Sequence, residues 1–182
     1  RQIADKDNPQ GIIAAVKRPL VALGTLSPEA CPWVVALVSP QDPGNIGTIL
    51  RTLDATGAGA LFILDGGAES THPSAVRASM GALFWRPVLR TTFGQFLAWA
   101  HQGGYHVLGT SSHASQEISA VRAYPRPLAL LLGSEQKGLT SEQAAACDQL
   151  LRLPMQGHAT SLNLAVAAGV FLYDILLKPV LA

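Results

Sequence analysis

The chain contains a series of short apolar runs, each bounded by glycine, proline or aspartate. A strand that is apolar at every position must be covered on both faces, which is typical of a parallel sheet packed between helices. Helix-length segments separate most of these runs. The sequence therefore predicts an α/β fold with a mainly parallel sheet and helices on both faces. The predicted strands are 12–16, 33–39, 59–64, 105–109, 128–132 and 150–153, and the predicted helices are 46–56, 74–84, 93–102, 141–147 and 162–177.

The composition favours a single folded domain. The 182 residues are 48% hydrophobic and 14% charged, and the charged share lies well below the roughly 25% of average soluble domains. This composition excludes a disordered chain and a coiled coil. The formal net charge is only +1, so the chain lacks the basic excess of proteins that hold nucleic acid by overall charge. Binding to nucleic acid would depend on local basic residues, namely Arg77, Arg86, Arg90 and Lys137.

The N-terminal residues, the longest apolar stretch and the cysteines indicate where in the cell the protein is found. Residues 1–10 are polar and contain a proline, which predicts a linker from a preceding region, with the folded domain in 11–182. The longest apolar stretch, 164–173, is shorter than the roughly 20 residues that cross a membrane. Cys31 and Cys147 form no C-x-x-C pair, and the five histidines show no metal-ligand spacing. We therefore expect a cytoplasmic protein with no membrane segment and no metal.

Three loops leave predicted strands at their carboxyl ends, where open α/β sheets bind ligands. The first, 42–47, ends near Asn45, which is a good N-cap for a helix that begins at residue 46. Arg51 follows nearly two turns along that helix. Taken alone, these two residues are explained by helix capping and by a solvated helix surface.

The second loop, 133–138, has the G-x-x-x-x-G spacing of a phosphate-binding P-loop, but Leu139 stands where a P-loop requires lysine. This excludes a nucleoside triphosphate site of that kind. No G-x-G-x-x-G follows any predicted strand, which argues against a standard dinucleotide-binding domain. Glu135 in this loop is equally well explained as a solvated charge.

The third loop, 154–161, precedes the longest predicted helix. Thr160 or Ser161 is expected to cap that helix, and Asn163 follows within its first residues. The helix is apolar nearly all round, so we expect it to be buried on most sides, partly in a subunit interface.

Together the loops carry three ordered motifs: N-I-G-T-I-L-R at 45–51, L-L-G-S-E-Q-K-G-L at 131–139, and L-P-M-x-G-x-x-x-S-L-N-L-A-V-A-A at 153–168. This set resembles the SpoU/TrmH-type RNA 2′-O-ribose methyltransferases of the SPOUT superfamily. The resemblance covers about 34–177, and 76–82 also fits it.

The resemblance implies a catalytic domain with a C-terminal trefoil knot, in which the end of the chain threads through an earlier loop. It implies S-adenosylmethionine as cofactor, a homodimer that uses the last helix, and transfer or ribosomal RNA as substrate. Its implied catalytic residues are Asn45, Arg51, Glu135, Ser161 and Asn163. Its implied cofactor contacts are Thr110, Gly133, Leu153, Met155 and Leu162.

Methyl transfer to a ribose hydroxyl needs alignment, a dry pocket and a way to remove the hydroxyl proton. Arginine is an awkward base because it stays protonated, but the charge of Arg51 can stabilise a developing alkoxide while an RNA phosphate helps to accept the proton. Asn45 and Glu135 would orient Arg51 or the ribose. Ser161 and Asn163 would position the substrate and hold their loop, and Gly133 would permit close approach of the cofactor.

Three alternatives stay open at this point. One is a non-catalytic dimeric RNA-binding or ribosome-assembly protein built on the same scaffold. The others are a relative that methylates a base and a relative that has lost activity. Affinity for the cofactor separates an enzyme from a scaffold protein.

Overall fold

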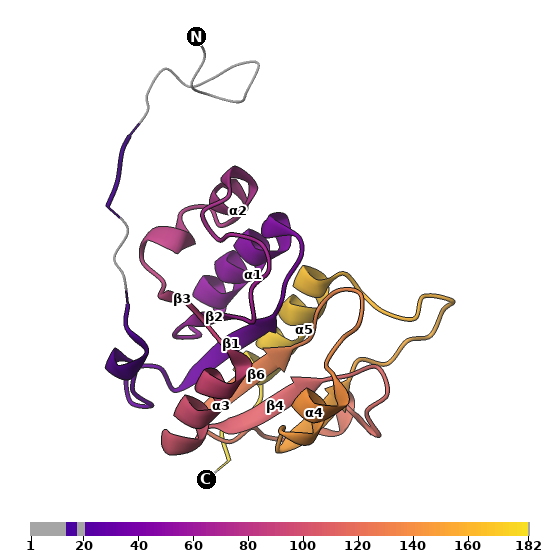
Figure 1. Cartoon of the computed structure of the whole chain (residues 1–182). Coiled ribbons are helices and arrows are strands. Elements are labelled where there is room, and N and C mark those ends of the chain that lie inside the picture. The colour runs from indigo at the N-terminus through magenta and orange to yellow at the C-terminus, as the bar shows by residue number, and fades with distance from the viewer. Residues whose placement is uncertain (1–13, 18–20, 182) are drawn as a thin grey trace.

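The computed structural model describes residues 14–17 and 21–181, and these form one seven-stranded sheet in which every pairing is parallel (Figure 1). The strand order is β3-β2-β1-β6-β4-β7-β5. The strands are β1 (Trp33–Val38), β2 (Leu61–Leu64), β3 (Val88–Thr91), β4 (His106–Thr110), β5 (Gln116–Glu117), β6 (Leu128–Leu132) and β7 (Gln149–Arg152). The helices are α1 (Pro43–Thr56), α2 (Pro73–Ala78), α3 (Phe93–Gln102), α4 (Ser141–Ala145) and α5 (Leu164–Leu177), with single 3₁₀ turns η1 (Leu23–Thr25), η2 (Ala82–Phe84) and η3 (Ile118–Ala120). The predicted parallel α/β fold is confirmed.

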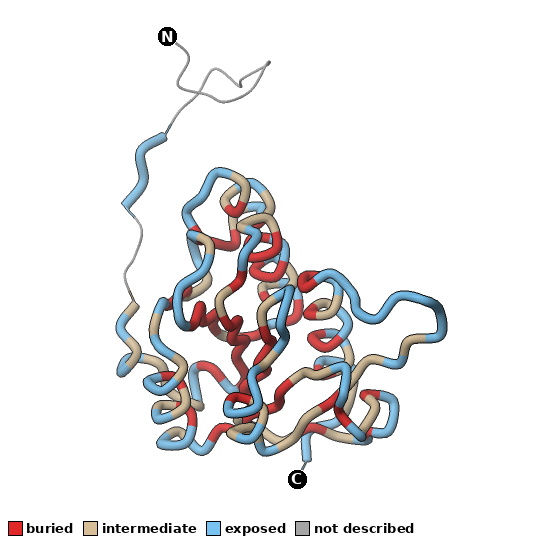
Figure 2. The backbone as a smooth tube through the Cα atoms, turned by 45° about the vertical axis from the view of Figure 1, so that its right-hand side comes forward, coloured by how far each residue is buried: buried red, intermediate tan, exposed pale blue. Residues whose placement is uncertain are grey.

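The core has two apolar layers, one on each face of the sheet. Along β1, Val35 and Leu37 enter the layer shared with α1 and α5, whereas Val34 and Ala36 enter the layer shared with α3. Every residue of β1, β2 and β6 is buried, as Figure 2 shows for the centre of the molecule. These strands are apolar throughout because alternate side chains feed opposite layers. Among the described residues, no helix is both long and apolar enough to span a membrane.

Two strands were not predicted, and one prediction fails. β3 carries an exposed arginine at its third position, and β5 consists of two polar residues at the sheet edge, so neither has an apolar pattern. The predicted strand 12–16 is wrong for residues 14–16, which are exposed and irregular. Its first two residues, like the predicted linker 1–10, lie outside the described residues.

Both helices that border the candidate site begin elsewhere than predicted. α1 starts at Pro43, and the side chain of Asp42 caps it by accepting from the Gly44 amide at 2.8 Å. The interpretation of Asn45 as the N-cap is therefore wrong, because proline at the first helical position with aspartate before it sets the start. α5 is capped by Asn163 rather than by Thr160 or Ser161.

The predicted helix 74–84 is interrupted. α2 ends at Ala78, and the backbone then passes through left-handed conformations at Met80 (φ 50°) and Gly81 (φ 99°) before η2. A continuous right-handed helix cannot include two such residues. The segment nevertheless packs closely against α1. Gly47 of α1 permits this approach, because a Cβ there would lie 2.3 Å from the carbonyl oxygen of Ala75.

Candidate functional site

Three loops at the carboxyl ends of neighbouring strands surround a cavity of about 440 Å³. Its walls come from the residues that follow β4, β6 and β7, and from the start of α5. Strands β6, β4 and β7 are adjacent in the sheet, so their carboxyl ends meet at one edge. All five predicted cofactor contacts line this cavity: Thr110, Gly133, Leu153, Met155 and Leu162.

The wall of the cavity is part apolar and part polar. Leu132, Leu139 and Phe171 add apolar surface, and Ser111 and Lys137 add polar groups. A volume within the range of about 300 to 1,000 Å³ is typical of small-molecule sites. The wall is about equally polar and apolar, so the cavity can hold a ligand that has both a ring and polar ends.

The loop after β6 is pinched at its base. The Ser134 amide donates to the Gly138 carbonyl at 3.2 Å, and the Gly138 amide donates back to the Ser134 carbonyl at 2.9 Å. A Cβ on Gly133 would lie 2.0 Å from the carbonyl carbon of Gly138 and 2.3 Å from the Leu139 nitrogen. Gly133 is therefore required because the returning backbone of its own loop fills the space that a side chain would need.

A chain of hydrogen bonds joins the three motifs. Asn45 donates from Nδ2 to Oε1 of Glu135 at 3.1 Å, and its Oδ1 accepts from Nδ2 of Asn163 at 3.0 Å. Asn163 in turn accepts from the Ala165 and Val166 amides at 2.8 and 3.3 Å, which fixes the start of α5. Each amide is oriented by the next group, so the Asn45 side chain, which is 7% exposed, is held by two motifs at once.

The Glu135 carboxylate also binds the loop after β1. It accepts from the Gln41 amide at 3.0 and 3.2 Å and from the Asp42 amide at 3.4 Å. Burial raises the pKa of Glu135, but the backbone amides and the Asn45 side chain outweigh this and lower the pKa below its ordinary value. Glu135 is therefore a carboxylate at neutral pH, and its oxygens are already engaged as acceptors.

Replacing Glu135 with glutamine is expected to reduce stability at neutral pH by about 1 kcal/mol, since the charged acceptor is lost and the site is partly exposed. Because the folded pKa is lowered, the stabilisation is complete above the ordinary value of 4.5 and is lost as the pH falls through the folded pKa. Urea unfolding of wild type and Glu135→Gln across this range measures the difference. A difference that stays constant on acidification would contradict the expectation.

The remaining two predicted catalytic residues lie in different surroundings. Ser161 lines the cavity. Arg51 lies on the exposed surface of α1 and does not line the cavity, and its side chain makes no hydrogen bond or ion pair with any other described residue. Asn45 and Glu135, expected to orient Arg51 or the ribose, instead bond to each other, and Asn45 bonds also to Asn163.

Several residues at the site were not predicted from the sequence. The cavity wall includes Ser111, Ser112 and His113, which directly follow β4 and which the strand-end rule could have indicated. The backbone amides of Gln41 and Asp42 carry no sequence signal of this kind. Among the residues that the structure describes, no group of histidine, cysteine, aspartate or glutamate side chains could hold a metal ion.

The comparisons with known proteins bear on this arrangement. Residues 32–173 match the family model described as the SpoU rRNA Methylase family. The chain belongs to this family. The match includes all three motif loops and most of α5, so the cavity and the hydrogen-bond chain lie inside the family domain.

Members of the SpoU family with solved structures share the fold. An rRNA methyltransferase from Sinorhizobium meliloti, solved with AdoMet bound, has a TM-score of 0.81 and 35% identity over 86% of this chain and 60% of that chain. The SpoU methyltransferase AviRb from Streptomyces viridochromogenes, in complex with the cofactor AdoMet, has a TM-score of 0.72 and 34% identity over 79% of this chain and 58% of that chain.

A curated relative from Streptomyces viridochromogenes is a 23S rRNA (uridine(2479)-2′-O)-methyltransferase, 34% identical over 172 residues, which is 91% of this chain and 60% of that protein. The chain spans about 60% of the length of the curated relatives it matches.

Proposed function

We propose that the protein transfers a methyl group from S-adenosylmethionine to a ribose 2′-OH of transfer or ribosomal RNA. The observation that carries this proposal is the cavity at the ends of β6, β4 and β7, whose wall contains every predicted cofactor contact. Membership of the SpoU family and the AdoMet-bound relatives support it.

The residues around the cavity fit the cofactor. Leu153, Met155 and Leu162 would cover its apolar surfaces, and the pinched loop after Gly133 would place backbone groups against its polar parts. When bound, the cofactor supplies a methyl group activated by a sulfonium charge. The chain of hydrogen bonds from Glu135 to Asn163 keeps the walls in place, and water is excluded from the reaction once the cofactor and the ribose fill the cavity.

The proton of the ribose hydroxyl needs a partner outside the hydrogen-bond chain, because the Glu135 oxygens are already engaged as acceptors. In this proposal an RNA phosphate accepts the proton, while the guanidinium of Arg51 approaches the ribose from outside the cavity and stabilises the developing alkoxide. Ser161, in the cavity wall, positions the ribose, and Asn45 and Asn163 act as positioning residues.

The knotted course of the chain and a cytoplasmic location belong to the same proposal. The Tyr124 amide donates to the Pro179 carbonyl at 2.9 Å, and the Leu181 amide donates to the Tyr124 carbonyl at 2.8 Å. The segment after α5 therefore runs beside an earlier loop, which supports the threading that the family implies. Both cysteines are unpaired thiols, which suits a reducing compartment.

Incubation with RNA and methyl-labelled S-adenosylmethionine tests the activity. A methyl group on the 2′-oxygen blocks attack on the neighbouring phosphate, so label in alkali-resistant dinucleotides is the expected result. Label on bases alone would reassign the product. Cofactor binding without any labelled RNA would favour the alternative of a non-catalytic RNA-binding or assembly protein.

The outer face of α5 predicts a homodimer. Val166, Val170, Tyr173 and Leu177 are exposed by 53, 43, 46 and 78%, although the opposite side of the helix is packed in the core. An exposed apolar strip of this kind is typical of an interface. Sedimentation at micromolar concentration is expected to show a dimer, and Val170→Glu is expected to weaken it at least tenfold. A monomeric wild type would contradict the prediction.

A further inference from the structure

A second exposed apolar surface lies outside the cavity, on the turn between α2 and β3. Met80, Phe84 and Trp85 are exposed by 68, 44 and 60%, and we call these three residues the 80–85 patch. Scattered apolar residues are common on surfaces, but three large ones on a single short turn indicate a site that binds something.

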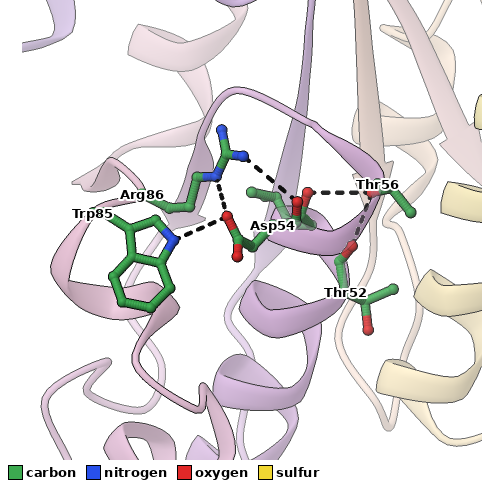
Figure 3. Close-up of polar contacts among 6 residues, drawn as sticks. Thr52, Asp54, Thr56, Trp85 and Arg86 are labelled. Carbon is green, nitrogen blue, oxygen red and sulfur yellow. Dashed lines mark hydrogen bonds and ion pairs between the residues drawn. The ribbon is translucent and has the colours of Figure 1, made fainter.

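Trp85 is held in a fixed orientation although most of it is exposed. Its indole Nε1 donates to Oδ1 of Asp54 at 3.0 Å, and Nε of Arg86 donates to the same oxygen at 2.6 Å (Figure 3). The far edge of the ring packs over Gly81, where an added Cβ would lie 2.8 Å from the ring. A ring already fixed in this way loses little conformational entropy when a ligand stacks on it.

The segment that carries the patch is positively charged. Residues 73–90 contain three arginines and no acidic residue. Arg86 is paired with Asp54, and Arg90 lies 3.5 Å from Glu69. Arg77 is exposed, and its guanidinium makes no hydrogen bond or ion pair with another described residue, so its charge is available to a ligand.

The patch lies on the same side of α1 as Arg51. On α1, Gly47 contacts α2 and Asp54 contacts Trp85. Arg51 lies four residues after Gly47 and three residues before Asp54. Residues at these spacings share one face of a helix. A substrate whose ribose reaches Arg51 would therefore have its neighbouring nucleotides over the segment 73–86.

We infer that the 80–85 patch and Arg77 bind the single-stranded RNA next to the target nucleotide, with one base stacked on Trp85 and a phosphate on Arg77. The inference rests on the proposed function and adds where the RNA is held. A fixed aromatic ring on the same short segment as an arginine with a free side chain is a combination that recognises unstacked bases and the phosphate backbone. A second copy of the chain would match the apolar side chains but not the free charge of Arg77.

The test uses a labelled oligouridylate of about ten nucleotides, a length that single-strand sites accommodate. Fluorescence anisotropy measures its affinity for the chain at several salt concentrations. Trp85→Ala is expected to lower the affinity about ten- to a hundredfold and to leave the salt dependence unchanged. Trp85→Phe keeps a ring and should retain most of the affinity, which also checks that a loss in Trp85→Ala is not caused by misfolding.

Arg77→Gln is expected to reduce the slope of log affinity against log salt by about 0.7, the value for one phosphate contact on a single strand. The matched control is Arg122→Gln. Arg122 is exposed, its side chain bonds to no other described residue, and it follows β5 at the opposite edge of the sheet from β3, so the slope should stay unchanged. Stacking on Trp85 should also quench its fluorescence, and this change should be absent in Trp85→Phe.

Wild-type affinity in Trp85→Ala, or no binding of the oligouridylate by wild type, would overturn the inference. If Trp85→Ala weakens only the dimer in sedimentation, the patch belongs to a copy-to-copy interface instead. Titration of each variant with S-adenosylhomocysteine should match wild type. Failure of wild type in that titration would count against the proposed function, and it can be read separately from the RNA result.

Discussion

Replacing Arg51 with alanine is expected to lower the rate of methyl transfer by a factor of about 10² to 10⁴, the usual cost of losing a group that assists proton removal or stabilises an alkoxide. Cofactor affinity should change by less than about tenfold, or roughly 1.4 kcal/mol, because Arg51 does not line the cavity. Stability should be nearly unchanged, since this exposed side chain makes no bond to another described residue. Single-turnover methylation at saturating RNA and cofactor measures the rate.

Two further variants test whether the effect depends on the geometry of the Arg51 side chain and on its position. Arg51→Lys keeps the charge but loses the planar fork, so it should remain substantially impaired if orientation matters. Arg122→Ala removes an exposed arginine elsewhere and should react like wild type. Wild-type turnover by Arg51→Ala would remove this residue from the mechanism, and lost cofactor affinity with normal turnover at saturation would assign it to binding.

Gly133→Val is expected to lower cofactor affinity by at least a hundredfold. The new Cβ would occupy the position of the Gly138 and Leu139 backbone, so the loop that forms one wall of the cavity must open. Gly133→Ala should already show most of the effect, because the Cβ itself causes the clash. Isothermal titration with S-adenosylhomocysteine measures the affinity, and near-UV circular dichroism checks that the rest of the fold persists.

The matched control for Gly133 is Gly157→Ala. Gly157 lies in the exposed loop after β7, its φ is not in the left-handed region, and a Cβ there would meet no atom within 4 Å. This variant should bind the cofactor about as well as wild type. A folded Gly133→Val protein with wild-type affinity would show that the pinched loop does not shape the cofactor site.

The sequence predicted the elements whose own pattern is strong. β6 and α3 begin and end where predicted, because an apolar run bounded by proline and glycine and a capped amphipathic helix are local signals. β5 was not predicted because its two polar residues become a strand only by pairing with β7. The start of α1 was readable from Asp42 and Pro43, but Asn45 has the same capping chemistry and was preferred.

The candidate site, too, was predictable from the sequence only where the signal is local. The strand-end rule and the family motifs located the loops after β1, β6 and β7 but only Thr110 of the region after β4, and the residues expected to contact the cofactor do line one cavity. The bonds of Asn45 to Glu135 and to Asn163 span 90 and 118 residues of sequence, so no local pattern contains them. The clash behind Gly133 is also a tertiary property, because it depends on how the loop returns.

The measurement that tests the central claim most directly is a calorimetric titration of the chain, without RNA, with S-adenosylhomocysteine. We expect one site per chain with a dissociation constant below millimolar, lost in Gly133→Val and kept in Gly157→Ala. Absence of measurable heat at millimolar ligand would contradict a cofactor site in the cavity. So would binding that Gly133→Val leaves unchanged, because the ligand would then lie outside the cavity at the ends of β6, β4 and β7.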